Sequence, residues 1–333
     1  MRLTLFRRLC LLGTIIALCV VVLGAWVRLG DAGLGCPDWP GCYGHLTVGQ
    51  AVQNVETANA AFPDRPLEAE KALKEMIHRY LASTLGLLII AIAVVAWTNR
   101  GDRAQPVRLP GFLVLLVVFQ GLLGMWTVTL LLKPLIVSAH LVGGLTTMSL
   151  LWWMSLRVDR TTRPPGERRL RTWAAVGLVV LVFQILLGGW TSSNYSALAC
   201  PDFPTCQNSF WPDMDFKDAF VLWRGLGIDY EGGVLDHPAR VAIHYTHRLW
   251  AVVTAVVLGF VAWRASRTGQ SRAVRMAGGA IAAVLVVQWI LGPVMVLNTL
   301  PLQLATAHNA VAALLLLSMV ALLRFLWAPK TFR

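Results

Sequence analysis

The sequence predicts an all-α integral membrane protein of eight transmembrane helices, built as two tandem four-helix bundles with pseudo-twofold symmetry along the membrane normal. Three observations support this fold class. The chain is 56% hydrophobic and only 14% charged, which is far less charge than soluble proteins of this length carry. Apolar runs of about 20 residues, enough to cross a ~30 Å hydrocarbon core, recur along the chain. Several short motifs occur twice, about 165 residues apart.

Eight apolar runs are long enough to span a membrane. Charged residues are rare within them and gather at their ends. The first run follows three arginines but precedes no small-x-small cleavage site, so we expect a retained helix and not a cleaved signal peptide. The predicted spans are 9–29, 76–97, 109–131, 135–156, 172–193, 241–263, 276–298 and 303–326.

The charged residues predict the orientation. Most of the 29 Lys and Arg lie on one side of the predicted spans, together with only Asp102, Asp159 and Glu167 among the acids. By the positive-inside rule, this side faces the cytoplasm, and both termini lie on it. The expected location is a bacterial inner membrane. The net charge of +12 is thereby accounted for by topology and by contact with anionic lipid, which argues against a nucleic-acid partner.

The repeated motifs appear in the same order in each half of the chain. The stretch Cys36-Pro-Asp-Trp-Pro-Gly-Cys42 follows the first span, and Cys200-Pro-Asp-Phe-Pro-Thr-Cys206 follows the fifth. Later pairs are His78-Arg79 with His247-Arg248, Gln120 with Gln288, and His140 with His308.

Four helices return the chain to the side where it began, so the two halves are expected to be parallel repeats. We predict an N-terminal bundle at 1–156, a cytoplasmic linker at 157–171 and a C-terminal bundle at 172–333.

Four histidines lie within the predicted spans at one common depth: His78, His140, His247 and His308. Each follows the outer end of a span by a few residues, which places all four within roughly 10 Å of the outer surface. Two helices that each project an imidazole into a bundle can ligate a haem iron from both sides. A single membrane histidine often only bridges helices by hydrogen bonds, but the repetition favours haem ligation. Zinc and di-iron sites need more ligands than each bundle offers.

Glu75 precedes His78 by one helical turn, so both residues share a helix face. An ionisable carboxyl at membrane depth indicates a functional site. The alternative is a water-facing carboxylate that pairs with Lys74 or Arg79. His244 takes the matching position in the second half, so the two halves are expected to differ in chemistry.

Arg79 and Arg248 directly follow two of the histidines. Each guanidinium could pair with a haem propionate, since such pairs are strong and often bidentate. Alternatively, each side chain extends to a lipid phosphate.

The loop cysteines are expected in an oxidising compartment, where disulfides persist. Because the two cysteines of each loop are separated by only five residues, we expect local bonds, Cys36 with Cys42 and Cys200 with Cys206. Such short rings add modest stability, so both a structural and a redox role remain open.

These motifs resemble those of the haem A synthase family. The resemblance covers nearly the whole chain in order, with the repeat intact. The matching stretches are Gly24-Ala-Trp26-Val-Arg28 onward to Cys42, Glu75-x-x-His78-Arg79, His140, Cys200 to Cys206, His247-Arg248 and His308.

The resemblance implies a reaction. The methyl group at ring position eight of haem O would be oxidised to a formyl group, through an alcohol and a hydrated aldehyde, giving haem A for terminal oxidases. A resident haem b would lie between His247 and His308. Haem O would bind between His78 and His140, with Glu75 as the catalytic proton-transferring residue.

The implied partners are haem O and membrane lipid, because the farnesyl tail of this substrate can stay in lipid. The farnesyltransferase that makes haem O and cytochrome oxidase assembly factors are further expected partners, and the electron donor is left open. Two other functions remain: a non-catalytic haem carrier or exporter, and a b-type electron-transfer cytochrome. A carrier has no need of Glu75, and a quinone-linked cytochrome usually spreads its haems over both leaflets.

Overall fold

The computed structural model describes residues 2–156, 168–269 and 271–327, and all regular structure within these ranges is helical. Eight of the described helices are long and apolar enough to cross a membrane, which confirms the predicted number of spans. They are α1 (Arg2–Leu29), α4 (Ala69–Thr98), α5 (Arg108–Thr129), α6 (Pro134–Ser155), α7 (Arg168–Ser193), α9 (His237–Thr268), α10 (Arg272–Leu297) and α11 (Leu302–Leu326). Three short loop helices were not predicted: α2 (Val48–Gln53), α3 (Val55–Ala61) and α8 (Phe216–Ala219).

Several helices begin earlier than the sequence predicted. α4 begins at Ala69 and not at 76, and α9 begins at His237 and not at 241. The apolar pattern detects only the part of a helix that lies in hydrocarbon, whereas Lys, Arg and Glu extend the helix beyond it because they are good helix formers. The prediction that the histidines follow the helix starts by a few residues is therefore wrong for His78 and His247, which lie roughly two to three turns inside.

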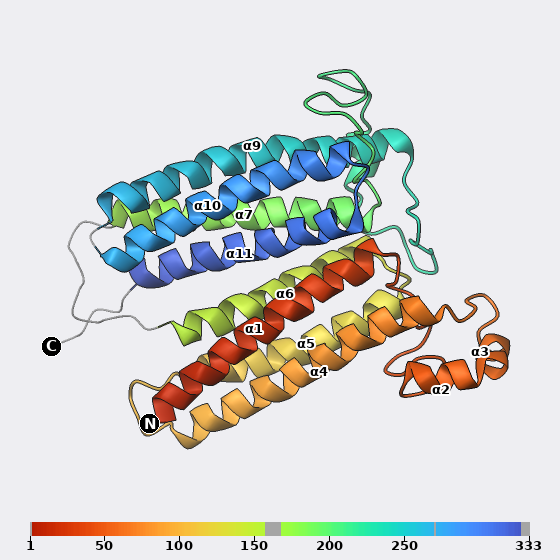
Figure 1. Ribbon diagram of the computed structural model, residues 1–333, viewed down its shortest axis with the longest axis horizontal. Helices are drawn as coiled ribbons and strands as arrows, with labels where there is room; N and C mark the ends of the chain where they lie inside the picture. Colours follow the sequence, from red (N-terminus) through yellow and green to blue (C-terminus); the bar gives the residue numbers. More distant parts are fainter. Residues whose placement is uncertain (1, 157–167, 270, 328–333) are drawn as a thin grey trace.

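The eight long helices form two groups of four (Figure 1). α1, α4, α5 and α6 pack around one another, as do α7, α9, α10 and α11. The groups meet where α1 and α6 face α7 and α11. This arrangement is compatible with the predicted tandem symmetry. Of the predicted linker at 157–171, residues 157–167 lie outside the described part of the chain. Its last four residues, 168–171, belong to α7.

One large hydrophobic core joins both groups near the ends of the helices that lie away from the cysteine loops. An indole hydrogen bond also connects the groups there, from Trp152 Nε1 of α6 to the Leu317 carbonyl of α11 at 3.0 Å. Fully buried members of the core include Phe6, Ile92, Met148, Leu151, Leu258 and Met319.

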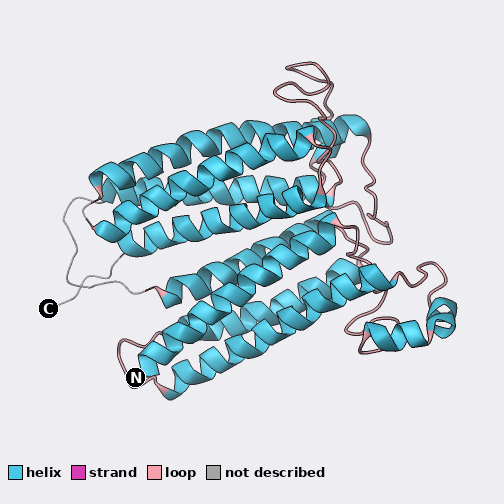
Figure 2. Ribbon diagram, viewed as in Figure 1, coloured by secondary structure: helices cyan, strands magenta, loops and turns pink. Residues whose placement is uncertain are grey.

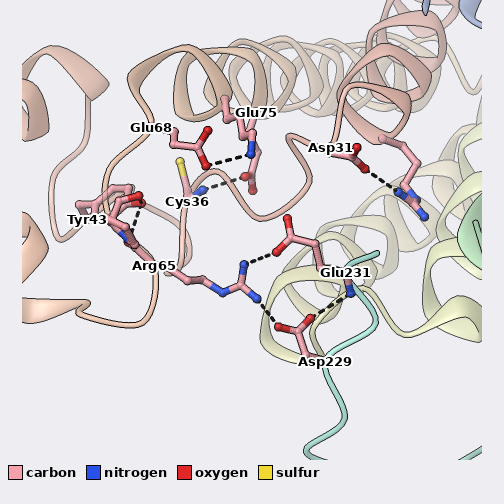
Figure 3. Close-up of polar contacts among 11 residues, drawn as sticks. Asp31, Cys36, Tyr43, Arg65, Glu68, Glu75, Asp229 and Glu231 are labelled. Carbon is pink, nitrogen blue, oxygen red and sulfur yellow. Dashed lines mark hydrogen bonds and ion pairs between the residues drawn. The ribbon is translucent and has the colours of Figure 1, made fainter. Parts of the chain in front are cut away.

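The two longest loops leave the helices at the same end of the molecule (Figure 2). They are tied together by Arg65, whose guanidinium pairs with Asp229 at 2.6 Å and with Glu231 at 2.8 Å (Figure 3). Lys133, just before α6, donates to the Gly225 carbonyl. The loop of the second half therefore covers part of the first half.

Candidate functional site

A single cavity of about 870 Å³ extends from the cysteine loops into the helices of both groups. Its volume falls in the range of about 300–1,000 Å³ that is usual for ligand and cofactor pockets. All four predicted histidines line it: His78, His140, His247 and His308. The sequence-predicted site residues are thus brought together in one place.

The four histidines divide between the two helix groups. His78 of α4 and His140 of α6 line the cavity in the first group, and His247 of α9 and His308 of α11 line it in the second. Within the described residues, the Nδ1 atoms of His78, His140 and His308 are buried without a hydrogen-bond partner. Buried polar atoms are rarely left unpaired. Paired imidazoles with unused ring nitrogens fit the axial ligand set of a haem iron.

Each histidine packs against a glycine of a neighbouring helix. Without a side chain at these positions, the helix backbone can approach the imidazole closely. A Cβ added to the glycine would lie 2.9 Å from the His78 ring at Gly24, 3.2 Å from His247 at Gly188, 3.5 Å from His140 at Gly124 and 3.7 Å from His308 at Gly292. A side chain at Gly24 or Gly188 would force the facing imidazole to move.

Glu75 lies in α4 at the edge of the cavity and is only 5% exposed. One carboxylate oxygen accepts a hydrogen bond from the Cys36 backbone N–H at 2.9 Å (Figure 3), and the other pairs with Arg79. Lys74 pairs with Glu70 instead. Glu75 is therefore a buried carboxylate beside a histidine pair, and it does not face water.

His244 makes the equivalent contacts in the second half. Its Nδ1 lies 3.4 Å from the Cys200 backbone nitrogen, and its Nε2 lies 3.2 Å from the Arg248 Nε. A neutral imidazole has one acceptor nitrogen, so His244 accepts a hydrogen bond from one of these two donors at a time. A carboxylate and an imidazole thus occupy matching positions beneath the two cysteine loops.

Arg79 and Arg248 hold the cysteine loops against the helices. Arg79 donates to the carbonyl oxygens of Asp38 at 3.0 Å and Gly41 at 2.5 Å. Arg248 donates to those of Asp202, Thr205 and Cys200 at 2.8, 2.9 and 2.7 Å. The Arg79 side chain is 13% exposed, so it does not extend outward toward lipid phosphates. Both arginines also line the cavity, and their contact with a propionate stays a prediction.

The two cysteine loops have the same construction. The sulfur atoms lie at disulfide distance, 2.02 Å for Cys36 and Cys42 and 1.99 Å for Cys200 and Cys206. In the second loop, Asp202 accepts hydrogen bonds from the backbone of Gln207 and Asn208 and from Thr205. Although desolvation opposes it, this bonding lowers the pKa of Asp202 to about 2. Trp39 and Phe203, at matching loop positions, cover the cavity.

Two glutamines beside the second histidine pair have roles that the sequence analysis missed. Gln184 Nε2 lies 3.2 Å from His247 Nδ1, and Gln288 Nε2 lies 3.0 Å from His308 Nε2. The position that matches Gln184 in α1 is Val20. Aligning the two halves on their cysteine loops reveals this difference.

Arg28 connects the halves at the cavity. Its guanidinium donates to the Ser192 carbonyl of α7 at 2.7 Å and lies 4.2 Å from the centre of the Tyr195 ring. Arg28 and Ser192 are themselves matching positions of the repeat. The contact therefore lies where the two halves are related to each other.

The fold and the site define a multi-pass helical membrane protein with two histidine pairs in one cavity. The model of the COX15-CtaA family, described as cytochrome oxidase assembly protein, matches residues 7–320, and the chain belongs to this family. The chain is 44% identical to the heme A synthase of Shewanella oneidensis over 98% of its own length and 97% of that protein. It is 28% identical to the heme A synthase of Rhizorhabdus wittichii over 93% and 90%, and 29% identical to that of Caulobacter vibrioides over 89% of each. The resemblance inferred from the motifs is confirmed.

Proposed function

We propose that this chain is a haem A synthase, which oxidises the C8 methyl group of haem O to a formyl group and supplies haem A to terminal cytochrome oxidases. The full-length similarity to heme A synthases carries this proposal. The geometry adds to it, because one cavity contains two histidine pairs and, among the described residues, only the first pair has a buried carboxylate beside it.

We propose that the second half holds a resident haem b through His247 and His308. When bound, this group supplies oxidation-reduction chemistry that no side chain can provide. Gln184 and Gln288 lie within hydrogen-bond distance of the two imidazoles and fix their orientation, as outer-shell partners of metal ligands usually do.

The first half binds the substrate, haem O, between His78 and His140. Glu75 acts as the proton-transferring residue, because each two-electron oxidation of the methyl carbon releases two protons, which a group within reach of the substrate must accept. Arg79 and the Cys36 N–H stabilise the ionised carboxylate. The cysteine loop, through Trp39, limits the access of water to the reacting edge.

The proposed location is a bacterial inner membrane with both termini in the cytoplasm and both cysteine loops in the periplasm. The concentration of Lys and Arg on one side of the spans supports this orientation. The farnesyltransferase that makes haem O and cytochrome oxidase assembly factors are the proposed protein partners. The loops would then operate where disulfides are stable.

The function is tested by expressing the chain in a bacterial host with and without a supply of haem O, then extracting the bound haems for mass analysis. We expect haem b under both conditions and haem A only when haem O is supplied. Haem O bound without any conversion would indicate a carrier. Haem b alone under both conditions would indicate an electron-transfer cytochrome.

A further inference from the structure

The cavity is not equally deep in the two halves. In the first half it continues past the histidines along the seam between α4 and α5, where Leu87, Ile90 and Val118 line it. At ~1.5 Å per residue, the distance along α4 from His78 to Ile90 is roughly 18 Å. Leu87 and Val118 are 70% and 60% exposed, so this extension reaches the surface that faces lipid.

The second half lacks this extension. The positions that match Leu87, Ile90 and Val118 are Val256, Gly259 and Val286. All three belong to the described part of the chain, and none is among the residues that line the cavity. The two seams therefore differ although the two histidine pairs match.

The two seams also differ where they join the cavity, because the first half has a glycine there and the second has a tryptophan. Gly121 of α5 lines the cavity, and a Cβ added there would meet no atom within 4 Å. The matching residue of α10 is Trp289, which also lines the cavity and is 44% exposed. Gly86 of α4, across the first seam, is nearly as open, since its added Cβ would meet only Val117, at 3.8 Å.

We propose that this seam, the α4–α5 groove, binds the isoprenoid tail of haem O and is the lateral opening through which the substrate enters from the membrane. The inference rests on the proposed function. The groove is apolar and continuous with the His78 and His140 site. The tail is the part of haem O that haem b lacks, and within the described residues the cavity runs along the seam as far as Ile90 only in the half assigned to haem O, whereas on α9 it ends at Thr254.

The groove selects its ligand by shape more than by hydrophobicity. Lipid is as apolar as the groove, so the tail gains little free energy from leaving lipid alone. A tail fixed in the groove prevents the porphyrin from rotating about the line between its two histidine ligands. The groove therefore determines which methyl group lies next to Glu75.

The test is the variant Gly121→Trp, which gives the first half the residue that the second half has at the matching position. Because Trp289 occupies the matching position in the half assigned to a tailless haem, the substitution should block the tail and still admit a porphyrin. Purified protein containing its resident haem is titrated with haem O and, separately, with haem B. We expect affinity for haem O to fall about tenfold or more, while affinity for haem B changes little.

The control is Gly111→Trp, the same substitution in the same helix at an exposed position outside the cavity, which should behave as the wild type. If Gly121→Trp does not retain resident haem, Val118→Trp narrows the groove from its lipid side. If a folded groove variant still prefers haem O over haem B as strongly as the wild type does, the inference is overturned. The groove would then be assigned to an ordinary lipid chain. A wild-type protein that makes no haem A overturns the proposed function instead, so the two failures are distinguishable.

Discussion

The two halves of this molecule hold their cysteine loops against the helices at matching positions, but with different residues. In each half, a side chain one helical turn before a cavity histidine accepts a hydrogen bond from the backbone of the first loop cysteine. Glu75 does so in the first half and His244 in the second. Because either residue satisfies the loop, the fold alone does not require a carboxylate. The comparison supports the proposal that Glu75 is present for chemistry.

Two further differences point the same way. The second half has Gln184 beside its histidines where the first has Val20, and Trp289 where the first has Gly121. A glutamine that contacts a histidine, and a tryptophan at the seam, suit a site that keeps its ligand. An open seam suits a site that exchanges substrate for product.

The largest effect should follow from removing the second histidine pair. Replacing His247 and His308 by alanine together deletes both proposed ligands of the resident haem. We expect the b-type absorbance of the purified protein to disappear, whereas the His78→Ala and His140→Ala double variant should retain it. A normal low-spin spectrum in the first variant would refute the assignment of the halves.

The polar support of the second pair can be removed separately. Gln184→Val reproduces the first half at this position and deletes the hydrogen bond to His247. Outer-shell partners of metal ligands contribute about 10- to 100-fold to affinity, so resident haem should transfer to apomyoglobin faster by about that factor. Val20→Gln in the first half is the matched control and should leave this transfer rate unchanged.

The loop disulfides should have similar structural effects and different functional ones. Replacing Cys36 and Cys42 by alanine, or Cys200 and Cys206, should lower the free energy of unfolding by about 2 kcal/mol in each case. Thermal loss of the haem absorbance measures this. Only the first pair should also reduce haem A output, since the Cys36 N–H binds Glu75. Equal losses of output from both pairs would argue against the functional difference.

The smallest effect should come from the contact between the loops. Arg65→Ala removes two ion pairs to Asp229 and Glu231, whose side chains are 48% and 34% exposed. Exposed pairs contribute about 0–1 kcal/mol. The midpoint of thermal unfolding should therefore change only slightly, and more at low salt than at high salt. A large loss of stability would mean that the two halves depend on their loops far more than on their helix interface.

The sequence predicted the number of spans and singled out the four histidines that line the cavity, because both follow from local patterns that are repeated. It did not predict the early start of α4 at Ala69, because the apolar pattern ends where the helix leaves hydrocarbon. Nor did it predict the contact of Arg28 with Ser192 or that of Arg65 with Asp229. These depend on how the two halves pack together, and no periodicity within one segment encodes that packing.

The exchange of Glu75 tests the central claim most directly. Glu75→Gln is nearly isosteric, and Glu75→His copies the second half and can still accept the Cys36 hydrogen bond. Both variants are expressed with haem O supplied, and the extracted haems are measured by mass analysis. We expect haem b content near that of the wild type and haem A production lower by about 10²- to 10⁴-fold, the usual contribution of an acid–base residue. Near-normal haem A from either variant would contradict the account and reduce Glu75 to a structural tether of the loop.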